Sequence, residues 1–372
     1  MRKMMTSLLV STVFLMLGGC TRKPLFLRMP TTGLEVTVNT RINTDITTDI
    51  LWGASWDADM LYKWNTDLYG NLGYTEPREA TGWFMEKINT KSTTVPRFLL
   101  FTKDFHKGQD TKVNMVIDVS HDILFHTDIK NSEMKLQSDH SRFDIVSLPD
   151  YDDVFDFEGE GFTPMKQPGE IFSVYIDDIN LKRDYPDVQP FDDDGELIYV
   201  YQLNAKLVPV TYIYIIQIVI VDDNGKYPDV DSISMITMSG MAASRNLLYQ
   251  KAGKDRCDIT ARDIYPGQQL GDSTVYMARM LSFGAPYATD YDDISWVIVD
   301  DARFKLGANI VMQDGTVKRL LADITPFINR HPTGGIYTIC INRSELQKNN
   351  AGGGFDITVE DWTTEVEVEI QI

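Results

Sequence analysis

Alternation of apolar and polar residues is the dominant pattern of this chain, and it predicts β-strands. Leucine and valine alternate with polar residues at Leu34 to Asn39, and a similar run follows at Phe172 to Ile179. Strand side chains point alternately to the two faces of a sheet, so a period of two indicates a strand with one buried face. The run Tyr212 to Val221 is apolar at nearly every position. This predicts a central strand that is covered on both faces.

Shorter runs of the same kind occur along the whole chain, separated by turn-forming residues. They are Leu99 to Phe101, Val113 to Val119, His121 to Phe125, Leu197 to Leu207, Ile233 to Thr237, Tyr276 to Phe283, Ile294 to Val299, Asn309 to Met312 and Tyr337 to Ile341. Asp222 to Gly225 and Asp314-Gly315 have the composition of hairpin turns. Helical periodicity is limited to one or two turns at Ile324 to Asn329. The expected fold is therefore all-β, with two β-sandwiches in tandem.

A segment rich in proline and aspartate, Asp184 to Asp194, marks the expected boundary between the two sandwiches. It places the N-terminal sandwich at residues 34–190 and the C-terminal sandwich at residues 195–372. The acidic stretch 149–170 also contains proline and glycine. It is predicted to be a loop or an excursion at the edge of a sheet, and not a helix.

The first twenty residues have the layout of a secretory signal peptide. A basic n-region is followed by an apolar stretch at residues 4–17, two glycines and Cys20. The Leu-Gly-Gly-Cys sequence resembles a bacterial lipobox, which implies removal of residues 1–19 and acylation of Cys20 with fatty acids such as palmitate. Several acyl chains hold a protein firmly on a bilayer. We therefore expect an outer-membrane lipoprotein in which residues 20–33 form a lipidated tether. An ordinary signal peptide with a chance cysteine, or a single anchor helix, is the alternative.

The net charge of −19 at neutral pH argues against two classes of partner. Nucleic acids and anionic lipid surfaces both attract basic proteins.

Of the three cysteines, Cys257 and Cys340 remain once Cys20 is assigned to lipid. An exported protein can form a disulfide between them. We favour two buried free thiols, because no other feature of the chain is typical of a disulfide-dependent protein.

Catalytic and metal-binding motifs are not recognisable in the sequence. The histidines lack the spacing of a zinc helix, and His121 and His126 would lie on opposite faces of a strand. Asp222, Asn224 and Asp229 match the spacing of a calcium loop only in part. We therefore expect no catalytic residues, no bound metal and no cofactor.

Aromatic residues are concentrated between residues 52 and 83. Trp52, Trp56, Trp64 and Trp83 could stack on the faces of sugar rings, which supports an alternative function as a carbohydrate-binding envelope lipoprotein. The same rings suit the core of a sandwich equally well. Exposed, coplanar rings would favour sugar binding, whereas buried rings would exclude it.

The last eight residues, Glu365 to Ile372, alternate without exception. Val366, Val368, Ile370 and Ile372 share one face, and polar residues share the other. The run is interpreted as the closing strand of the second sandwich. A strand at the end of a chain is also well placed to pair with another subunit, so these four residues form the candidate partner strand.

Five segments of the mature chain carry a family resemblance. They are Ser55 to Phe84, Val119 to Asn131 (VSHDILFHTDIKN), Ser234 to Ser244 (SMITMSGMAAS), Leu321 to Ile328 (LADITPFI) and Gly352 to Trp362 (GGGFDITVEDW). With the lipobox in front, their order resembles that of the fimbrillin-like lipoproteins of anaerobic Gram-negative bacteria, in the type V pilin superfamily. The resemblance covers most of the mature chain and points to a branch of unestablished function. It implies two transthyretin-like β-sandwiches.

The same resemblance implies a stalk, tip or anchor subunit of fimbriae, or a surface adhesin. In polymerising relatives a protease cuts after an arginine and removes the first strand, and the C-terminal strand of a neighbour fills the groove. Arg28 precedes the first predicted strand here, and Arg41 follows it. We expect a non-enzymatic anchor or accessory protein that keeps its lipid and has the membrane and other fimbrial subunits as partners. Thr21 to Pro24 lack the acidic residues of surface-bound relatives, so the surface and the periplasmic face both remain open.

Overall fold

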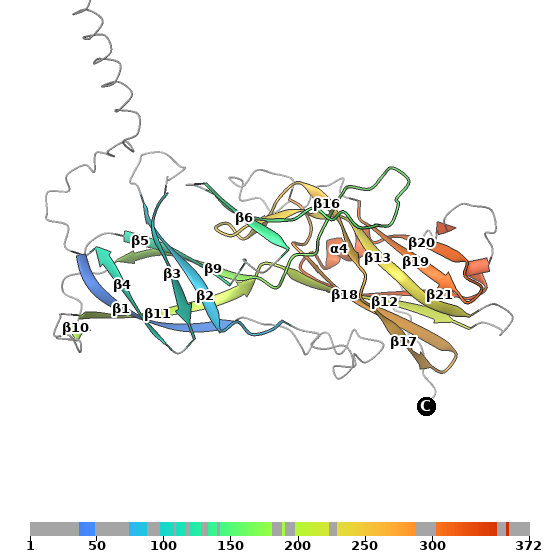
Figure 1. Cartoon of the computed structure of the whole chain (residues 1–372), viewed down its shortest axis with the longest axis horizontal. Coiled ribbons are helices and arrows are strands. Elements are labelled where there is room, and N and C mark those ends of the chain that lie inside the picture. Colours follow the sequence, from blue (N-terminus) through green and yellow to red (C-terminus); the bar gives the residue numbers. More distant parts are fainter. Residues whose placement is uncertain are drawn as a thin grey trace, which may run out of the picture.

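The structure confirms the all-β prediction. Figure 1 shows two lobes side by side along the long axis. The predicted signal peptide, Cys20, the tether and the candidate partner strand lie outside the described residues. The computed structural model describes residues 37–48, 74–87, 97–107, 109–116, 120–127, 129, 133–139, 142–180, 188–189, 198–222, 229–287, 303–347 and 355–356.

The N-terminal lobe is one sheet that folds over into two layers. Its strand order is β3-β2-β5-β9-β11-β1-β4, with β10 paired to β11. β9 and β11 pair at only two positions, Ser173 with Val208 and Phe172 with Pro209, which leaves the sheet free to bend there. The strands are β1 (Thr37–Thr48), β2 (Glu79–Lys87), β3 (Arg97–His106), β4 (Asp110–Val116), β5 (Ser120–His126), β9 (Phe172–Asn180), β10 (Val188–Gln189) and β11 (Ile198–Pro209).

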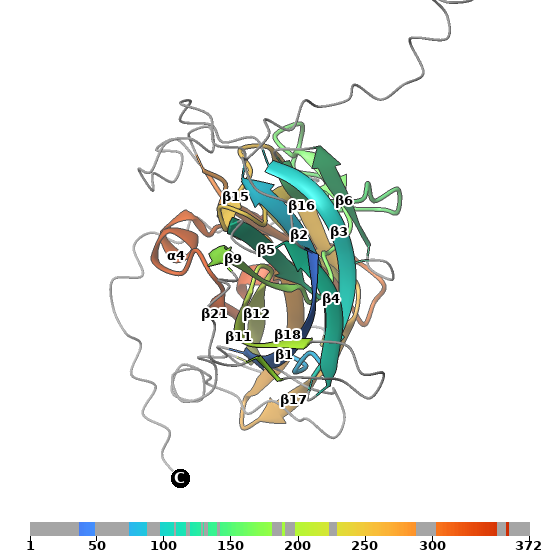
Figure 2. The same cartoon turned by 90° about the vertical axis from the view of Figure 1, so that its left-hand side faces the viewer.

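The two layers of this lobe enclose a common core. Phe84, Phe105 and Phe125 enter it from the layer that holds β2, β3 and β5, and Met115 and Leu203 enter it from the layer of β4 and β11. The rings of Phe105 and Phe125 meet edge to face, with centroids 5.1 Å apart. In Figure 2 the end strands β3 and β4 lie next to each other on one side of the lobe. The single sheet thus forms a β-sandwich.

Strand β11 belongs to the N-terminal lobe. It runs parallel to β1 over ten paired positions, from Asn39 with Ile198 to Thr48 with Leu207. The boundary that we predicted at residues 190–195 falls just before this strand, whereas the hydrogen-bonded sheet continues to Pro209. Prolines and aspartates mark a break between two strands, but the choice of sheet depends on a partner far away in sequence.

β1 is longer than the predicted first strand, and Arg41 lies inside it instead of following it. The backbone of Arg41 is opposite Val200 of β11 and Lys112 of β4. The expectation that Arg41 follows the strand is therefore wrong. A protease would have to open two ladders to reach the peptide bond after this residue.

The C-terminal lobe is a sandwich of two separate sheets. Their strand orders are β17-β18-β12-β21 and β22-β20-β19-β13-β16-β8. The strands are β8 (Thr163–Met165), β12 (Tyr212–Val221), β13 (Val230–Ala242), β16 (Arg256–Ala261), β17 (Ile264–Leu270), β18 (Ser273–Ser282), β19 (Lys305–Met312), β20 (Val317–Asp323), β21 (Gly335–Asn342) and β22 (Phe355–Asp356). The helix α4 (Thr325–Arg330) confirms the predicted helical turn, and a 3₁₀ turn, η1, covers Glu345–Gln347.

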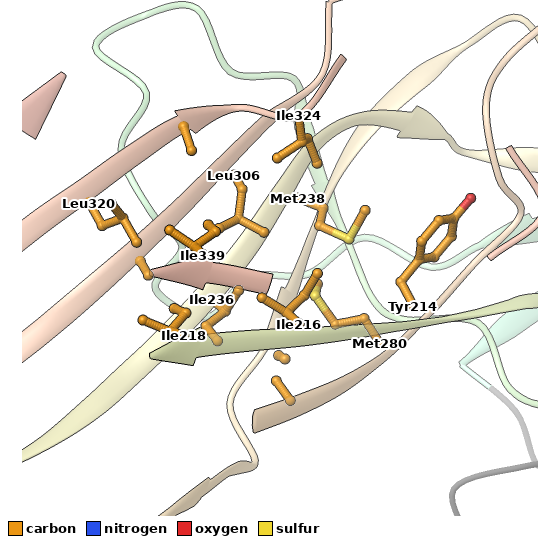
Figure 3. Packing of buried hydrophobic residues seen from close by; sticks show 14 of the residues in the cluster. Tyr214, Ile216, Ile218, Ile236, Met238, Met280, Leu306, Leu320, Ile324 and Ile339 are labelled. Carbon is orange, nitrogen blue, oxygen red and sulfur yellow. The ribbon is translucent and has the colours of Figure 1, made fainter. Parts of the chain in front are cut away.

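The largest cluster of buried side chains lies between these two sheets (Figure 3). Tyr214, Ile216 and Ile218 of β12 enter it from one sheet, and Met238 and Leu306 enter it from the other. β12 lies between β18 and β21, and the intervening residues of β12 border the N-terminal core. This confirms that the apolar run is a central strand with both faces covered.

Two predicted turns have different outcomes. Asp314-Gly315 connects the antiparallel pair β19 and β20, and Gly315 has a φ of 80°, which glycine adopts without strain. The hairpin predicted at Asp222 to Gly225 is wrong, because β12 and β13 belong to different sheets. The chain crosses the sandwich at this point instead of folding back on the same sheet. The strand predicted at Ile294 to Val299 lies outside the described residues.

The two cysteines of the body are free thiols. Cys257 lies in the core of the C-terminal sandwich, whereas Cys340 packs against the N-terminal core on the other face of the β12 sheet. A sheet thus separates the two sulfur atoms, which explains why they do not pair. Cys340 is only half-buried, so the expectation of two buried thiols holds fully for Cys257 alone.

Candidate functional site: the junction between the lobes

A fourth sheet joins the two lobes. Strands β6 (Met134–Asp139) and β7 (Arg142–Ser147) come from the N-terminal half, and β14 (Ser244–Asn246) and β15 (Lys251–Ala252) come from the C-terminal half. Their order is β15-β14-β7-β6, so the ladder between β7 and β14 crosses from one half to the other. We call this four-stranded unit the junction sheet.

A separate hydrophobic cluster packs beside the junction sheet. It contains side chains of both lobes and of the sheet, among them Met85, Leu124, Ile145, Val210, Leu247 and Phe283. Burial of apolar surface stabilises by about 25 cal/mol per Å². The junction is therefore a packed core of its own and not a flexible linker.

Asn246 is the central polar residue of the junction sheet. Its side chain is fully buried, and its amide nitrogen donates to Asp144 Oδ1 of β7 at 2.8 Å. Its carbonyl oxygen accepts from the backbone N–H groups of Leu248 and Tyr249 at 3.0 and 2.9 Å. One side chain thus links the two halves and shapes the turn between β14 and β15.

Arg245 lies beside Asn246 and is 5% exposed. Its guanidinium donates to the carbonyl of Gln250 at 2.7 Å and lies over the ring of Tyr212, 4.9 Å from the centroid. Gln250 in turn donates to Ser173 Oγ of β9 at 2.7 Å. Sequence reasoning missed these residues, although an arginine and an asparagine inside the apolar run of residues 241–248 are a recognisable signal of buried polar groups.

Trp83 is the tryptophan of the candidate sugar-binding set that falls within the described residues. Its indole N–H donates to His126 Nε2 at 2.7 Å, and its ring meets Phe143 of β7 edge to face at 5.2 Å. His126 Nδ1 lies 2.7 Å from the carbonyl oxygen of Thr127. The carbonyl can only accept and the indole can only donate, so His126 is the neutral tautomer with its proton on Nδ1. The half-buried ring of Trp83 therefore packs at the junction. Trp52, Trp56 and Trp64 lie outside the described residues.

The acidic stretch 149–170 lies across the outer face of the six-stranded sheet, and we call it the strap (Figure 1). Within the strap, β8 pairs in parallel with β16 at the edge of this sheet. The strap contacts side chains that alternate with core residues, namely Thr237 of β13, Asp258 of β16 and Arg319 of β20. The prediction of an excursion at a sheet edge is confirmed.

Aromatic residues hold the strap on the sheet. Phe155 and Phe157 are 3% and 4% exposed, and their ring centroids are 4.9 Å apart. Phe155 occupies the space above Gly307 of β19, where an added Cβ atom would come within 2.2 Å of the ring. The guanidinium of Arg319 also lies over the Phe155 ring, 4.9 Å from its centroid. A glycine in the middle of β19 thus makes room for a phenylalanine of the strap.

Ion pairs neutralise much of the acidity of the strap. Glu158 pairs with Arg319 at 3.2 Å, and Glu160 pairs with Lys305. Such exposed pairs contribute little to stability. Asp150 differs, because its side chain is only 4% exposed and pairs with Arg262 at 2.9 Å.

A further ion pair connects the end of the strap with both lobes. Glu170 pairs with Arg279 of β18 at 2.6 Å and accepts the backbone N–H of Thr75 at 2.8 Å. Gln167 accepts from the backbone N–H of Leu281 at 2.9 Å. The lobes are therefore connected through the junction sheet, its hydrophobic cluster and the strap.

Asp258 is a buried acid beneath the strap, and it is 3% exposed. Its Oδ2 accepts the backbone N–H of Phe162 at 2.9 Å. Burial raises the pKa of Asp258 above its ordinary value, and hydrogen bonds from Ser239 and Phe162 oppose this rise in the pKa.

The raised pKa of Asp258 predicts a pH-dependent effect of Asp258→Asn. A raised pKa in the folded state contributes stability below the pKa of the unfolded carboxyl, and that contribution is lost as the pH rises through the folded pKa. The stability of the Asp258→Asn variant relative to wild type should therefore increase between acid and neutral pH. Urea unfolding over a pH series measures this difference.

Asp314→Asn is the control, and its stability relative to wild type should change with pH in the opposite direction, because hydrogen bonds from Thr316 lower the pKa of Asp314. Two parallel curves for Asp258→Asn and wild type would contradict the prediction.

Two of the residues in the partial calcium-loop match pair with an arginine. Asp222 and Asp229 lie 3.3 and 2.8 Å from Nη1 of Arg343, whose side chain is 11% exposed. The guanidinium thus supplies the positive charge at this position. Asn224 lies outside the described residues.

The described part of the chain contains no cluster of three or more His, Cys, Asp or Glu side chains that could hold a metal ion. Its helices also include none with the length and apolar character needed to cross a membrane.

Comparison with known proteins finds solved structures that align with most of this chain at low sequence identity. No protein-family model matches this chain, and a search of curated proteins finds no relative. Among solved structures, a candidate adhesin from Bacteroides ovatus has a TM-score of 0.46 at 10% identity over 83% of this chain and 90% of its own. A candidate polysaccharide-binding protein from Bacteroides thetaiotaomicron has a TM-score of 0.42 at 8% identity, over 82% and 91% of the two chains. The fimbrial anchor protein Mfa2 from Porphyromonas gingivalis has a TM-score of 0.38 at 9% identity, over 82% and 90%.

Proposed function

We propose that this chain is a non-enzymatic protein of the bacterial cell envelope with a structural or adhesive role, namely a lipid-anchored fimbrial anchor or accessory subunit. The observation that carries the proposal is the connection of the two lobes by a shared sheet, a shared hydrophobic cluster and the strap. A body connected in this way keeps its two lobes at a fixed distance from each other. This property suits a protein that transmits force or presents a surface away from the membrane.

The sequence supplies the other support for this function. The lipobox-like end of the predicted signal peptide supports an anchor at Cys20, and five segments resemble fimbrillin-like lipoproteins. The acidic body is repelled by anionic lipid, so the lipid at Cys20 would be its attachment to the outer membrane. The carbohydrate-binding alternative would depend on Trp52, Trp56 and Trp64, because Trp83 packs at the junction.

Mass spectrometry of the protein purified from its own membranes tests the anchor. We expect the mature chain to begin at an acylated Cys20, and Cys20→Ala to move the protein from the membrane fraction to the soluble fraction. Cys340→Ser is the matched control, since this half-buried thiol should not affect membrane attachment. A mature chain that begins after Arg41 and forms ladders resistant to SDS would instead indicate a polymerising pilin.

Removal of residues 365–372 tests the candidate partner strand. If Val366, Val368, Ile370 and Ile372 pair with a fimbrial subunit, the shortened chain should remain in the membrane but lose the subunits that crosslink to the intact protein. Replacing only the glutamates of the opposite face by glutamine is the control, and it should retain the crosslinks. Unchanged crosslinking of the shortened chain would exclude these residues as the contact.

A further inference from the structure

The course of the chain gives the parallel pair β1 and β11 an unusual position. β1 is the first described strand after the predicted tether, and β11 is the last strand before the chain enters the C-terminal lobe at Tyr212. In the parallel register, Asn39 is opposite Ile198 and Thr48 is opposite Leu207. The N-terminal end of β1 and the C-terminal end of β11 therefore lie at opposite ends of the pair.

Tension between those two ends would load the pair in shear. The strands would have to slide along each other, so the hydrogen bonds of the parallel ladder, which are evenly spaced, would share the load. Tension between two adjacent ends would instead peel the strands apart, and the bonds would break one after another. β1 also pairs with β4 on its other edge, from Thr37 with Val116 to Asn43 with Asp110. Sliding β1 out of the sheet therefore requires two ladders to shear.

The residues that follow β11 are held firmly by the rest of the molecule. Val210 and Thr211 follow β11 directly, and both are fully buried. The backbone N–H of Val210 donates to the carbonyl of Ile171 at 2.9 Å. The hydroxyl of Thr211 accepts the backbone N–H of Ile171 at 3.1 Å, and the carbonyl of Thr211 accepts from the hydroxyl of Tyr74. A load on β11 thus passes into packed structure and not into a loose loop.

We propose that β1 and β11 form a mechanical clamp, the strand pair that carries tension between the N-terminal tether and the C-terminal lobe. The source of that tension rests on the proposed function, in which the tether is held by lipid and the distal lobe contacts a partner. The resistance itself is a property of strand register and chain direction. It is therefore measurable on the isolated protein.

Single-molecule pulling of the full mature chain tests the clamp with two attachment geometries. In the first geometry, click-reactive amino acids replace Thr37 and Lys206, which lie at opposite ends of the pair. In the second they replace Thr48 and Lys206, which lie at the same end, since Lys206 is opposite Thr47 and Thr48 is opposite Leu207. Both geometries load the same two strands, and only the direction of the load differs. Circular dichroism and the thermal midpoint confirm that both labelled proteins fold as the wild type does.

We expect the rupture force of the 37–206 geometry to be about twofold or more above that of the 48–206 geometry at equal loading rate, because forced unfolding follows the barrier along the pulled direction. The first rupture of the 37–206 geometry should release the N-terminal lobe and leave the C-terminal lobe folded. Equal forces in the two geometries, or a first rupture in the C-terminal lobe, would overturn the clamp. Neither result depends on acylation, so loss of the lipid anchor and loss of the clamp are separate outcomes.

Discussion

Replacing Phe155 by alanine should lower the free energy of unfolding by about 3–5 kcal/mol, the usual loss for a buried phenylalanine. Phe155 is 3% exposed, and its ring packs on Gly307 and under the guanidinium of Arg319. Alanine would leave a cavity above Gly307, which has no side chain to fill it. The strap would then lose its main apolar contact with the sheet. Urea unfolding measures the free energy, and limited proteolysis within residues 149–170 reports release of the strap.

Tyr151→Ala is the matched control for this experiment, because the ring of Tyr151 belongs to the same strap but is 91% exposed. We expect a change within about 0.5 kcal/mol for this variant, as for most surface substitutions. A Phe155→Ala variant as stable and as resistant to protease as Tyr151→Ala would show that the strap is not held by its aromatic residues.

Asn246→Ala is expected to destabilise the protein by about 3 kcal/mol, since unsatisfied buried groups cost about 1–3 kcal/mol each. The substitution removes the acceptor of two backbone N–H groups, at Leu248 and Tyr249, and the donor to Asp144. The lost hydrogen bonds lie at the ladder between β7 and β14, which connects the two halves. Calorimetry should therefore show one cooperative transition for the wild type and separate transitions of the two lobes for the variant.

Asn246→Asp separates the two roles of this side chain. A carboxylate still accepts from Leu248 and Tyr249, but it faces the carboxylate of Asp144 in place of donating to it. Acid pH, which protonates one of the two carboxylates, should restore part of the lost stability. Gln137→Ala is the control on the same sheet, because that side chain is exposed. A single unchanged transition for Asn246→Ala would exclude Asn246 as a link between the lobes.

Local patterns predicted those elements whose environment is encoded in adjacent residues. The apolar run Tyr212 to Val221 is found as β12 with the same bounds. The turn at Asp314-Gly315 and the helical turn at Thr325–Arg330 depend equally on local backbone preferences. Sequence reading is reliable here because periodicity and turn chemistry are properties of short segments.

Predictions that required a partner strand or a partner charge were weaker. The turn signal at Asp222 to Gly225 is compatible with a hairpin, but the chain enters the opposite sheet after it. The acidic residues of the strap suggest a solvated loop. Asp150 is nevertheless buried against Arg262, which lies far away in sequence. An alternating pattern shows which face of a strand is buried, but it does not identify the neighbour that covers it.

From the sequence alone follow the all-β class, the central position of β12 and the prediction of a lipid-anchored exported chain. The tertiary structure alone showed that β11 joins β1, that β7 and β14 pair across the two halves, and that the strap covers the outer sheet. The physical reason is that backbone ladders are chemically almost uniform, so many strands could pair with many others. The pairing is selected by the packing of distant side chains, such as Phe155 over Gly307, and this information becomes visible only when the chain is folded.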